Sequence, residues 1–178
     1  MDYRKVAYEA IINHLAMQNL HEFIQTLALA DSIAKPESVL EIGSHYGGSL
    51  WAWKQLPTVK KVVGVTLEPG SNEIWSENIE GCEIIYGNSQ DEEIAADVYS
   101  HGQFDLVFID GDHSYEGVLN DWNKYGNKAK KMVVVHDVKE SPTAPEHEVW
   151  KFWNEFENLS RCTIDAGIGT PGTGVFWI

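Results

Sequence analysis

Residues 104–114, FDLVFIDGDHS, join a short apolar run to a cluster of acids, a glycine and a histidine. An apolar run of this length is typical of a strand that is buried on both faces of a parallel sheet. Similar runs precede and follow it, and the segments between them carry apolar residues at helical spacing. The sequence therefore predicts an α/β fold in which strands alternate with helices.

The predicted strands and helices cover most of the chain. Five runs are expected as parallel strands: Ser38–Ile42, Val59–Leu67, Cys82–Tyr86, Phe104–Ile109 and Met132–Val135. Four helices are expected between or after them: Ser49–Leu56, Asn72–Asn78, Glu92–Ser100 and Tyr115–Lys130. Residues 162–165 and 175–178 flank a Gly/Pro turn and predict an antiparallel hairpin at the sheet edge. This order predicts a Rossmann-like, doubly wound sheet of five parallel strands plus a C-terminal antiparallel hairpin.

The N-terminal region is predicted to be helical over residues 1–35, because its apolar residues recur every three or four positions until Pro36. No linker or repeat divides the rest, so we expect a single domain over residues 1–178. It consists of the N-terminal helices (1–35) and the Rossmann-like core (36–178). The N-terminal helical region, with the tryptophans at positions 51, 53, 150 and 153, is a candidate roof over the site. For each single tryptophan, packing in the core or at the surface is the favoured alternative.

Composition excludes several classes of partner. The 178 residues include 13 Lys and Arg against 27 Asp and Glu, which gives a formal net charge of −14. Such a charge repels a nucleic acid backbone or an anionic membrane surface, so we expect neither as a partner. No run approaches the 18 apolar residues of a membrane span, and no signal-peptide pattern follows Met1, so we expect a cytoplasmic protein. Self-association into a homo-oligomer is left open.

The first site motif is Glu41-Ile42-Gly43-Ser44-His45-Tyr46-Gly47-Gly48-Ser49, at the predicted turn from strand to helix. Its glycines allow a ligand to approach the backbone, and the helix start offers unpaired N–H groups. It departs from the dinucleotide pattern GxGxxG, since bulky residues follow Ser44. The leading acid, Glu41, suits a cationic or amino-bearing ligand better than a phosphate. The alternative is a turn that binds nothing.

Two further segments end predicted strands with polar residues. A carboxylate after the second strand commonly accepts ribose hydroxyls, and here Glu68 is the candidate, with Thr66 two residues earlier. Glu68 is otherwise a solvated acid before a Pro-Gly turn. After the third strand, Ser89 and Gln90 of the segment GNSQD are candidates to hydrogen-bond an adenine edge. The alternative for this segment is an ordinary helix N-cap by Ser89 or Asn88.

The strongest motif follows the fourth strand, where Asp110, Asp112 and His113 lie within four residues. Ligands bind open α/β sheets in the crevice at the carboxyl ends of the strands. His136 and Asp137 follow the fifth strand, which we expect beside the fourth, so the two groups should meet at one mouth. The alternative is a solvated acidic turn that caps the next helix.

Together, VLEIGSHYGGS, FIDGDHSYEGV and VVVHDV resemble class I S-adenosylmethionine-dependent methyltransferases over roughly residues 36–140. They are most similar to the bacterial cephalosporin-biosynthesis and macrolide-sugar O-methyltransferases, and more distantly to catechol O-methyltransferase. The resemblance implies that a divalent metal binds Asp110, His136 and Asp137, and that His113 and Asp110 are catalytic, with His113 as the base. It also implies an S-adenosylmethionine site formed by Glu41, Gly43, Ser44, Gly47, Gly48, Ser49, Glu68, Ser89, Gln90 and Asp110.

The function implied is metal-assisted O-methylation of a small-molecule hydroxyl on a sugar, a phenol or a natural-product scaffold. One residue departs from the expected oxygen ligands, because Mg²⁺ prefers oxygen and position 136 is a histidine. Imidazole suits manganese, iron or zinc better. Three alternatives therefore stay open: a softer metal, a water molecule between His136 and the metal, or no metal and His136 as a base. Two other functions stay open as well: a non-catalytic S-adenosylmethionine-binding module, and an NAD-dependent oxidoreductase, against which the missing GxGxxG counts.

Overall fold

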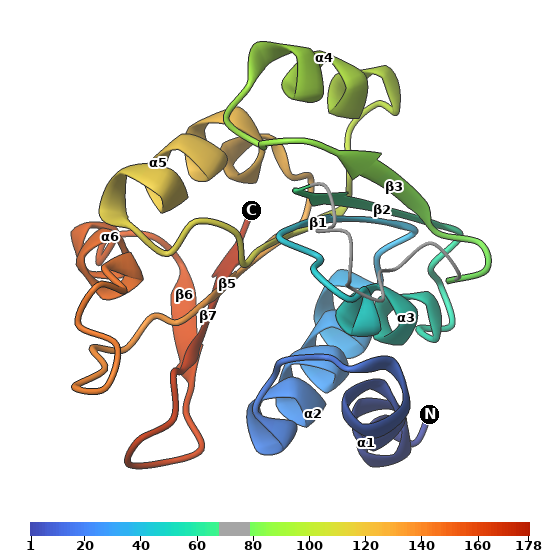
Figure 1. Cartoon of the computed structure of the whole chain (residues 1–178). Helices are drawn as coiled ribbons and strands as arrows, with labels where there is room; N and C mark the ends of the chain where they lie inside the picture. Colours follow the sequence, from blue (N-terminus) through green and yellow to red (C-terminus); the bar gives the residue numbers. More distant parts are fainter. Residues whose placement is uncertain (68–78) are drawn as a thin grey trace.

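The structure is a computed structural model that describes residues 1–67 and 79–178. Over these residues, seven strands form one sheet in the order β3-β2-β1-β4-β5-β7-β6 (Figure 1). Strands β1 to β5 pair in parallel, and β7 pairs antiparallel with both β5 and β6. The predicted doubly wound sheet with a terminal hairpin is confirmed. The strands are β1 Ser38–Ile42, β2 Lys61–Thr66, β3 Glu83–Tyr86, β4 Leu106–Ile109, β5 Met132–His136, β6 Arg161–Ile164 and β7 Thr173–Trp177.

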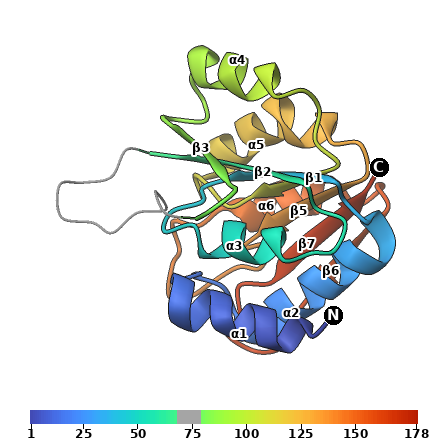
Figure 2. The same ribbon diagram turned by 90° about the vertical axis from the view of Figure 1, so that its right-hand side faces the viewer.

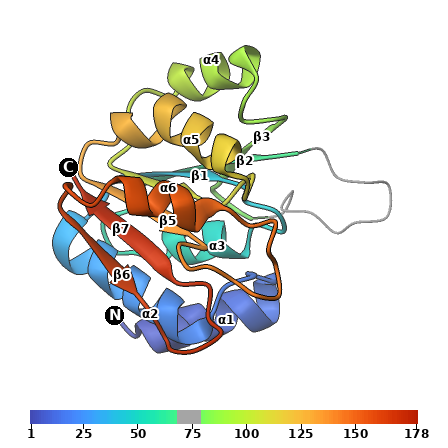
Figure 3. The ribbon, with the colours of Figure 1, turned by 90° about the vertical axis from the view of Figure 1, so that its left-hand side faces the viewer.

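Helices cover both faces of this sheet. Figure 1 shows α4, α5 and α6 on one face and α1, α2 and α3 on the other, and the two side views agree (Figures 2 and 3). A π-helical turn, Ala30–Ala34, extends α2, and a 3-10 turn, Gly126–Lys128, follows α5. None of the helices described is long and apolar enough to cross a membrane. The α-helices are α1 Tyr3–His14, α2 Leu20–Leu29, α3 Gly48–Lys54, α4 Glu92–Ser100, α5 Tyr115–Lys124 and α6 Val149–Glu155.

The two helical layers explain why the strands are apolar on both faces. Along β5, Val133 and Val135 pack into the cluster beneath α4, α5 and α6. Met132 and Val134 alternate with them and pack into the cluster on the side of α1, α2 and α3. Because successive side chains of a strand point to opposite faces, each strand contributes to both cores. His136 continues the series of Met132 and Val134 and therefore lies on the α2 side.

The element bounds differ from the sequence prediction at a few ends. The second strand begins at Lys61 rather than Val59, and β5 extends one residue further, to His136. The predicted helix from Tyr115 ends at Lys124, where the next residue leaves helical geometry and a 3-10 turn follows. The predicted helix Asn72–Asn78 lies outside the described residues.

Candidate functional site

A cavity of about 830 Å³ lies at the carboxyl ends of β1, β2, β4 and β5. This is the crevice where open α/β sheets bind ligands. The loops that follow these strands form most of its lining, and the segment after α1, Leu15 to Gln18, also contributes. No tryptophan is among the described residues that line it, so the tryptophan part of the predicted roof is wrong. Trp53 and Trp153 instead pack in the core.

The glycines of the first motif hold loops together. Gly43 has φ +88°, and a Cβ atom there would lie 1.9 Å from the backbone oxygen of Asp110. A Cβ on Gly48 would lie 2.3 Å from the backbone nitrogen of Ala16, and Gly47 caps α3 with φ +79°. The sequence suggested that these glycines make room for a ligand. In the structure, close backbone contacts already require Gly43 and Gly48, so larger residues there would disturb the fold first.

The polar residues of this motif divide between the cavity and the core. Ser44 and Ser49 line the cavity, and among the described residues the Ser44 hydroxyl has no hydrogen-bond partner. Glu41 does not line the cavity; it is 1% exposed and accepts a hydrogen bond from Ser49. Burial raises the pKa of Glu41 to about 8. A cofactor in the cavity therefore meets Ser49, with Glu41 behind it.

The next two predicted segments reach the same cavity. Thr66, at the end of β2, lines it, whereas Glu68 lies outside the described residues. Ser89 and Gln90 also line the cavity, and each is already bound to an acid. The Ser89 hydroxyl donates to Asp121 at 2.7 Å, and the Gln90 amide donates to Asp112 at 3.2 Å. Neither Ser89 nor Asn88 caps α4, which begins after Asp91 with no side-chain cap, so the alternative interpretation of this segment as an N-cap is wrong.

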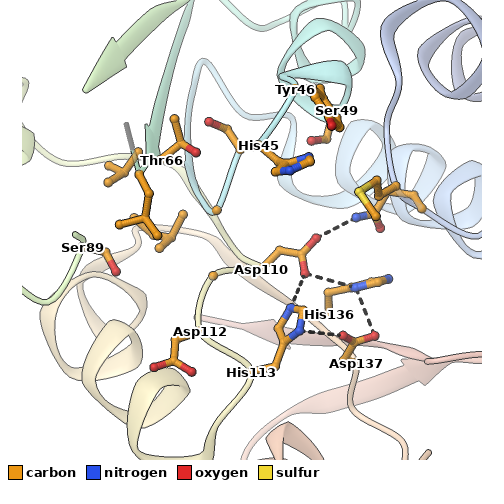
Figure 4. Close-up of a pocket in the computed structure, with 18 of the residues that line it drawn as sticks. His45, Tyr46, Ser49, Thr66, Ser89, Asp110, Asp112, His113, His136 and Asp137 are labelled. Atoms are coloured by element: carbon orange, nitrogen blue, oxygen red, sulfur yellow. Dashed lines mark hydrogen bonds and ion pairs between the residues drawn. The ribbon is translucent and has the colours of Figure 1, made fainter. Parts of the chain in front are cut away.

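Asp110 stands at the centre of the polar wall (Figure 4). Its Oδ1 lies 3.2 Å from His113 Nε2 and 3.2 Å from His136 Nδ1. Its Oδ2 accepts a hydrogen bond of 2.7 Å from the side-chain amide of Gln18. Burial raises the pKa of Asp110, but the two imidazoles outweigh it and hold the pKa well below its usual range. Asp110 is therefore an ionised carboxylate between two imidazoles.

Asp137 completes the wall from the end of β5. Its Oδ1 lies 3.3 Å from His136 Nδ1, and its Oδ2 lies 3.4 Å from His113 Nδ1 and 3.3 Å from His147 Nδ1. The backbone of Asp137 has φ +59°, an uncommon conformation for a residue other than glycine. The structure thus brings together Asp110, His113, His136 and Asp137, the four residues that the sequence predicted at one mouth.

His136 is the most buried of these groups. Burial lowers its pKa, but Asp110, Asp137 and, from α2, Glu22 raise it to about 9. Its Nδ1 faces the two aspartates, while its Nε2 is buried without a hydrogen-bond partner among the described residues. One oxygen of the buried Glu22 also has none. The imidazole is thus oriented with Nδ1 toward the cavity and Nε2 away from the two aspartates.

Asp112 has a different role from Asp110. Its Oδ1 accepts a hydrogen bond of 2.9 Å from the backbone N–H of Ser114, the residue that caps α5. The acidic turn before α5, which was the alternative for this motif, therefore exists. Asp112 forms it, whereas Asp110 contacts the histidines. Figure 4 shows Asp112 pointing away from the histidines that surround Asp110.

Two site residues were missed by the sequence reasoning. Gln18 lies in the coil after α1, and His147 lies in the loop before α6. The loop is held in place by a hydrogen bond of 2.7 Å from the backbone N–H of Glu148 to the carbonyl of His113. Neither residue belongs to a recognisable motif. Each reaches the site through contacts with residues that are distant in sequence, so no local pattern identified it.

Comparison with known proteins gives a family and a fold. A sequence profile for a family described as "Methyltransferase domain" matches residues 40–138. An uncharacterized protein of Acanthamoeba polyphaga mimivirus is 35% identical over 122 residues, which are 59% of this chain and 54% of that protein. The chain thus spans about half the length of this relative.

Solved structures share the fold at low identity. The MycE methyltransferase of the mycinamycin biosynthetic pathway, in complex with Mg and S-adenosylhomocysteine, has a TM-score of 0.68 at 15% identity, over 99% of this chain and 54% of MycE. The O-methyltransferase TomG of Streptomyces achromogenes, in complex with S-adenosylmethionine, has a TM-score of 0.67 at 18% identity, over 100% of this chain and 90% of TomG.

The sheet order, the helical layers and the cavity at the strand ends define the class I methyltransferase fold. Because the profile matches more than half of the chain, this chain belongs to the methyltransferase-domain family.

Proposed function

We propose that this chain transfers the methyl group of S-adenosylmethionine to a hydroxyl of a small molecule with the help of a divalent metal. One observation carries the proposal: the first-motif loop and the aspartate-histidine wall line the same cavity. Sugars, phenols and natural-product scaffolds are the acceptors we expect. The net charge of −14 disfavours nucleic acid as the acceptor and an anionic membrane as a partner.

The cofactor end of the cavity supplies hydroxyl groups and backbone. Ser44 lines it from the loop after β1, Ser49 from α3 and Thr66 from the end of β2, and the segment after β3 contributes Gly87 to Gln90. The buried Ser44 hydroxyl has no protein partner among the described residues, which leaves it available to a ligand. S-adenosylmethionine would supply an electrophilic methyl group, so this chain's residues need only position the acceptor and remove its proton.

The wall fits a divalent metal at Asp110, His136 and Asp137. Asp110 Oδ1 and Asp137 Oδ1 lie 3.2 and 3.3 Å from His136 Nδ1. Metal–ligand bonds of about 2.1 Å place neighbouring ligand atoms about 3.0 Å apart in an octahedron and about 3.4 Å apart in a tetrahedron. A bound metal would lower the pKa of an acceptor hydroxyl and orient it. With an imidazole among the donors, we expect Mn²⁺ to serve at least as well as Mg²⁺.

His113 is the proposed base. Its two ring nitrogens face Asp110 at 3.2 Å and Asp137 at 3.4 Å, which fixes the ring at the cavity wall. The hydrogen bond to Asp110 raises the pKa of His113 more than burial lowers it. The carboxylates thereby stabilise the imidazolium that forms when the ring takes the acceptor's proton.

Methyl transfer from labelled S-adenosylmethionine to a panel of sugars and phenols tests this function. We expect turnover that a chelator abolishes and that Mn²⁺ restores at least as well as Mg²⁺. Asp137→Ala should lose the metal response and keep much of its affinity for S-adenosylhomocysteine. Full turnover in chelator would reject the metal. Cofactor binding without turnover on any acceptor would favour a binding module.

A further inference from the structure

A second set of metal-ligating side chains lies beside the first. His113, Asp137 and His147 face one another across the cavity wall, from the loop after β4, the end of β5 and the loop before α6. Asp137 Oδ2 lies 3.4 Å from His113 Nδ1 and 3.3 Å from His147 Nδ1. The other nitrogen of His147 lies 3.4 Å from His113 Nδ1. Each side chain therefore approaches both of the others.

A metal ion takes one nitrogen from each imidazole, so the relevant separations are those from Asp137 Oδ2, 3.4 Å to His113 Nδ1 and 3.3 Å to His147 Nδ1. One ligand atom from each of the three side chains lies within 4.8 Å of the other two. These separations fit a small ion. Zn²⁺ bound by imidazole and carboxylate has bonds of about 2.0–2.2 Å, which put tetrahedral ligand atoms about 3.3–3.6 Å apart. Two imidazoles and one carboxylate are also the donor set of many sites for zinc and other late first-row metals, and a poor one for Mg²⁺. The second set therefore differs in chemistry from the site at Asp110, His136 and Asp137, which has two carboxylates and one imidazole.

The two sets use different oxygens of Asp137. Oδ1 faces His136 and Oδ2 faces His113 and His147, so one carboxylate serves both sets. The side chains of His113 and His147 are 29% and 32% exposed, compared with 7% for His136. An ion from solvent thus reaches the second set more easily than the first.

We propose that His113, Asp137 and His147 form a binding site for a late first-row transition-metal ion, Zn²⁺ above all, next to the proposed catalytic metal. The site is open on its fourth side to the cavity, where water or a substrate oxygen completes the coordination. Zinc bound here uses a lone pair of His113, and coordinated His113 cannot take a proton from an acceptor. Micromolar Zn²⁺ therefore inhibits methyl transfer; this consequence, unlike the binding itself, rests on the proposed function.

Calorimetric titration of the metal-free full chain with Zn²⁺ tests the binding, and it needs neither cofactor nor acceptor. His147→Ala removes the partly exposed ligand of this set that is neither the proposed base nor a proposed ligand of the first metal. We expect this variant to lose one equivalent of bound zinc or to bind it at least about 100-fold more weakly, since even outer-sphere partners contribute about 10–100-fold. His101→Ala is the matched control, because His101 also lies near two carboxylates, Glu83 at 3.4 Å and Asp97 at 4.0 Å, outside the cavity. It should titrate like the wild type.

Identical zinc isotherms for the wild type and His147→Ala would overturn the proposal, and so would a wild type that binds no zinc. The inhibition is measured separately, in Mn²⁺-supported methyl transfer with added Zn²⁺. There each protein is compared with its own turnover without zinc, and His147→Ala should lose a smaller fraction of that turnover than the wild type. If no methyl transfer is found in any protein, the proposed function fails while the titration still decides the zinc site.

Discussion

Glu41 lies in β1 and Asp110 directly follows the neighbouring strand β4, and their surroundings shift the pKa values of the two acids in opposite directions. Glu41 lies in β1 on the side of α3, where it accepts a hydrogen bond from the Ser49 hydroxyl, and burial raises its pKa to about 8. Asp110 follows β4 between two imidazoles, and its pKa lies well below the usual range although burial opposes this. What each acid faces, rather than burial alone, decides whether it is charged.

The difference separates two tasks at one edge of the sheet. A neutral Glu41 supports the loop that lines the cofactor end without adding charge to it. An ionised Asp110 keeps a negative centre at the reaction end, which is what a metal ion requires. The predictions below change one side of this comparison at a time.

The largest effect is expected from removing the base beside Asp110. His113→Ala should lower the rate of methyl transfer by roughly 10²–10⁴-fold, the usual loss for a general base, with affinity for S-adenosylhomocysteine nearly unchanged. Turnover and melting temperature should be measured on the same samples. A variant with normal turnover and a lower melting temperature would mean that His113 has only a structural role.

The next effect concerns Glu41. Its raised pKa means that stability from the protonated form is fully present below pH 4.5 and is lost as the pH rises through about 8. The side chain of Glu41→Gln is never charged. As the pH rises between these values, the free energy of unfolding of the variant should therefore increase relative to that of the wild type, by on the order of 2–4 kcal/mol. Denaturant unfolding of both proteins from pH 5 to pH 9 measures this. A difference that does not change with pH would contradict a neutral Glu41.

Asp121 is a second buried acid whose pKa is raised, by less than that of Glu41. It is buried, its side chain accepts its only hydrogen bond in the described structure from Ser89, and burial raises its pKa to about 6. Stability from its protonated form is present below pH 3.8 and is lost as the pH rises through about 6. Asp121→Asn should therefore be more stable than the wild type at pH 7, by on the order of 1–3 kcal/mol, and equal to it near pH 4. A loss of stability at pH 7 would show that the charge is needed.

The sequence predicted the sheet because each strand is a short apolar run, and parallel strands bring their carboxyl ends to one edge. That geometry alone placed Asp110 near His136 and Asp137. The strand pattern could not predict Gln18 and His147. Both lie in coil segments and reach the site through long-range contacts, which local sequence patterns do not encode. Strand alternation puts Glu41 on the face of Val39, but only the packing of α3 there determines that Ser49 meets it.

The same limit applies to Gly43. Its position in a strand-to-helix turn predicted a close approach by a ligand, whereas the structure places the backbone of Asp110 and Gly111 against it. A variant such as Gly43→Val would therefore test folding rather than cofactor binding. Ser44→Ala is the sharper change, because it removes a cavity hydroxyl that has no partner in the described protein.

Calorimetric titration of the wild-type chain with S-adenosylhomocysteine, and separately with NAD, tests the central claim most directly. If the cavity is a methyltransferase cofactor site, S-adenosylhomocysteine should bind saturably at one site per chain, and NAD should give no comparable heat. Tight binding of NAD with no response to S-adenosylhomocysteine would contradict the account and favour an oxidoreductase.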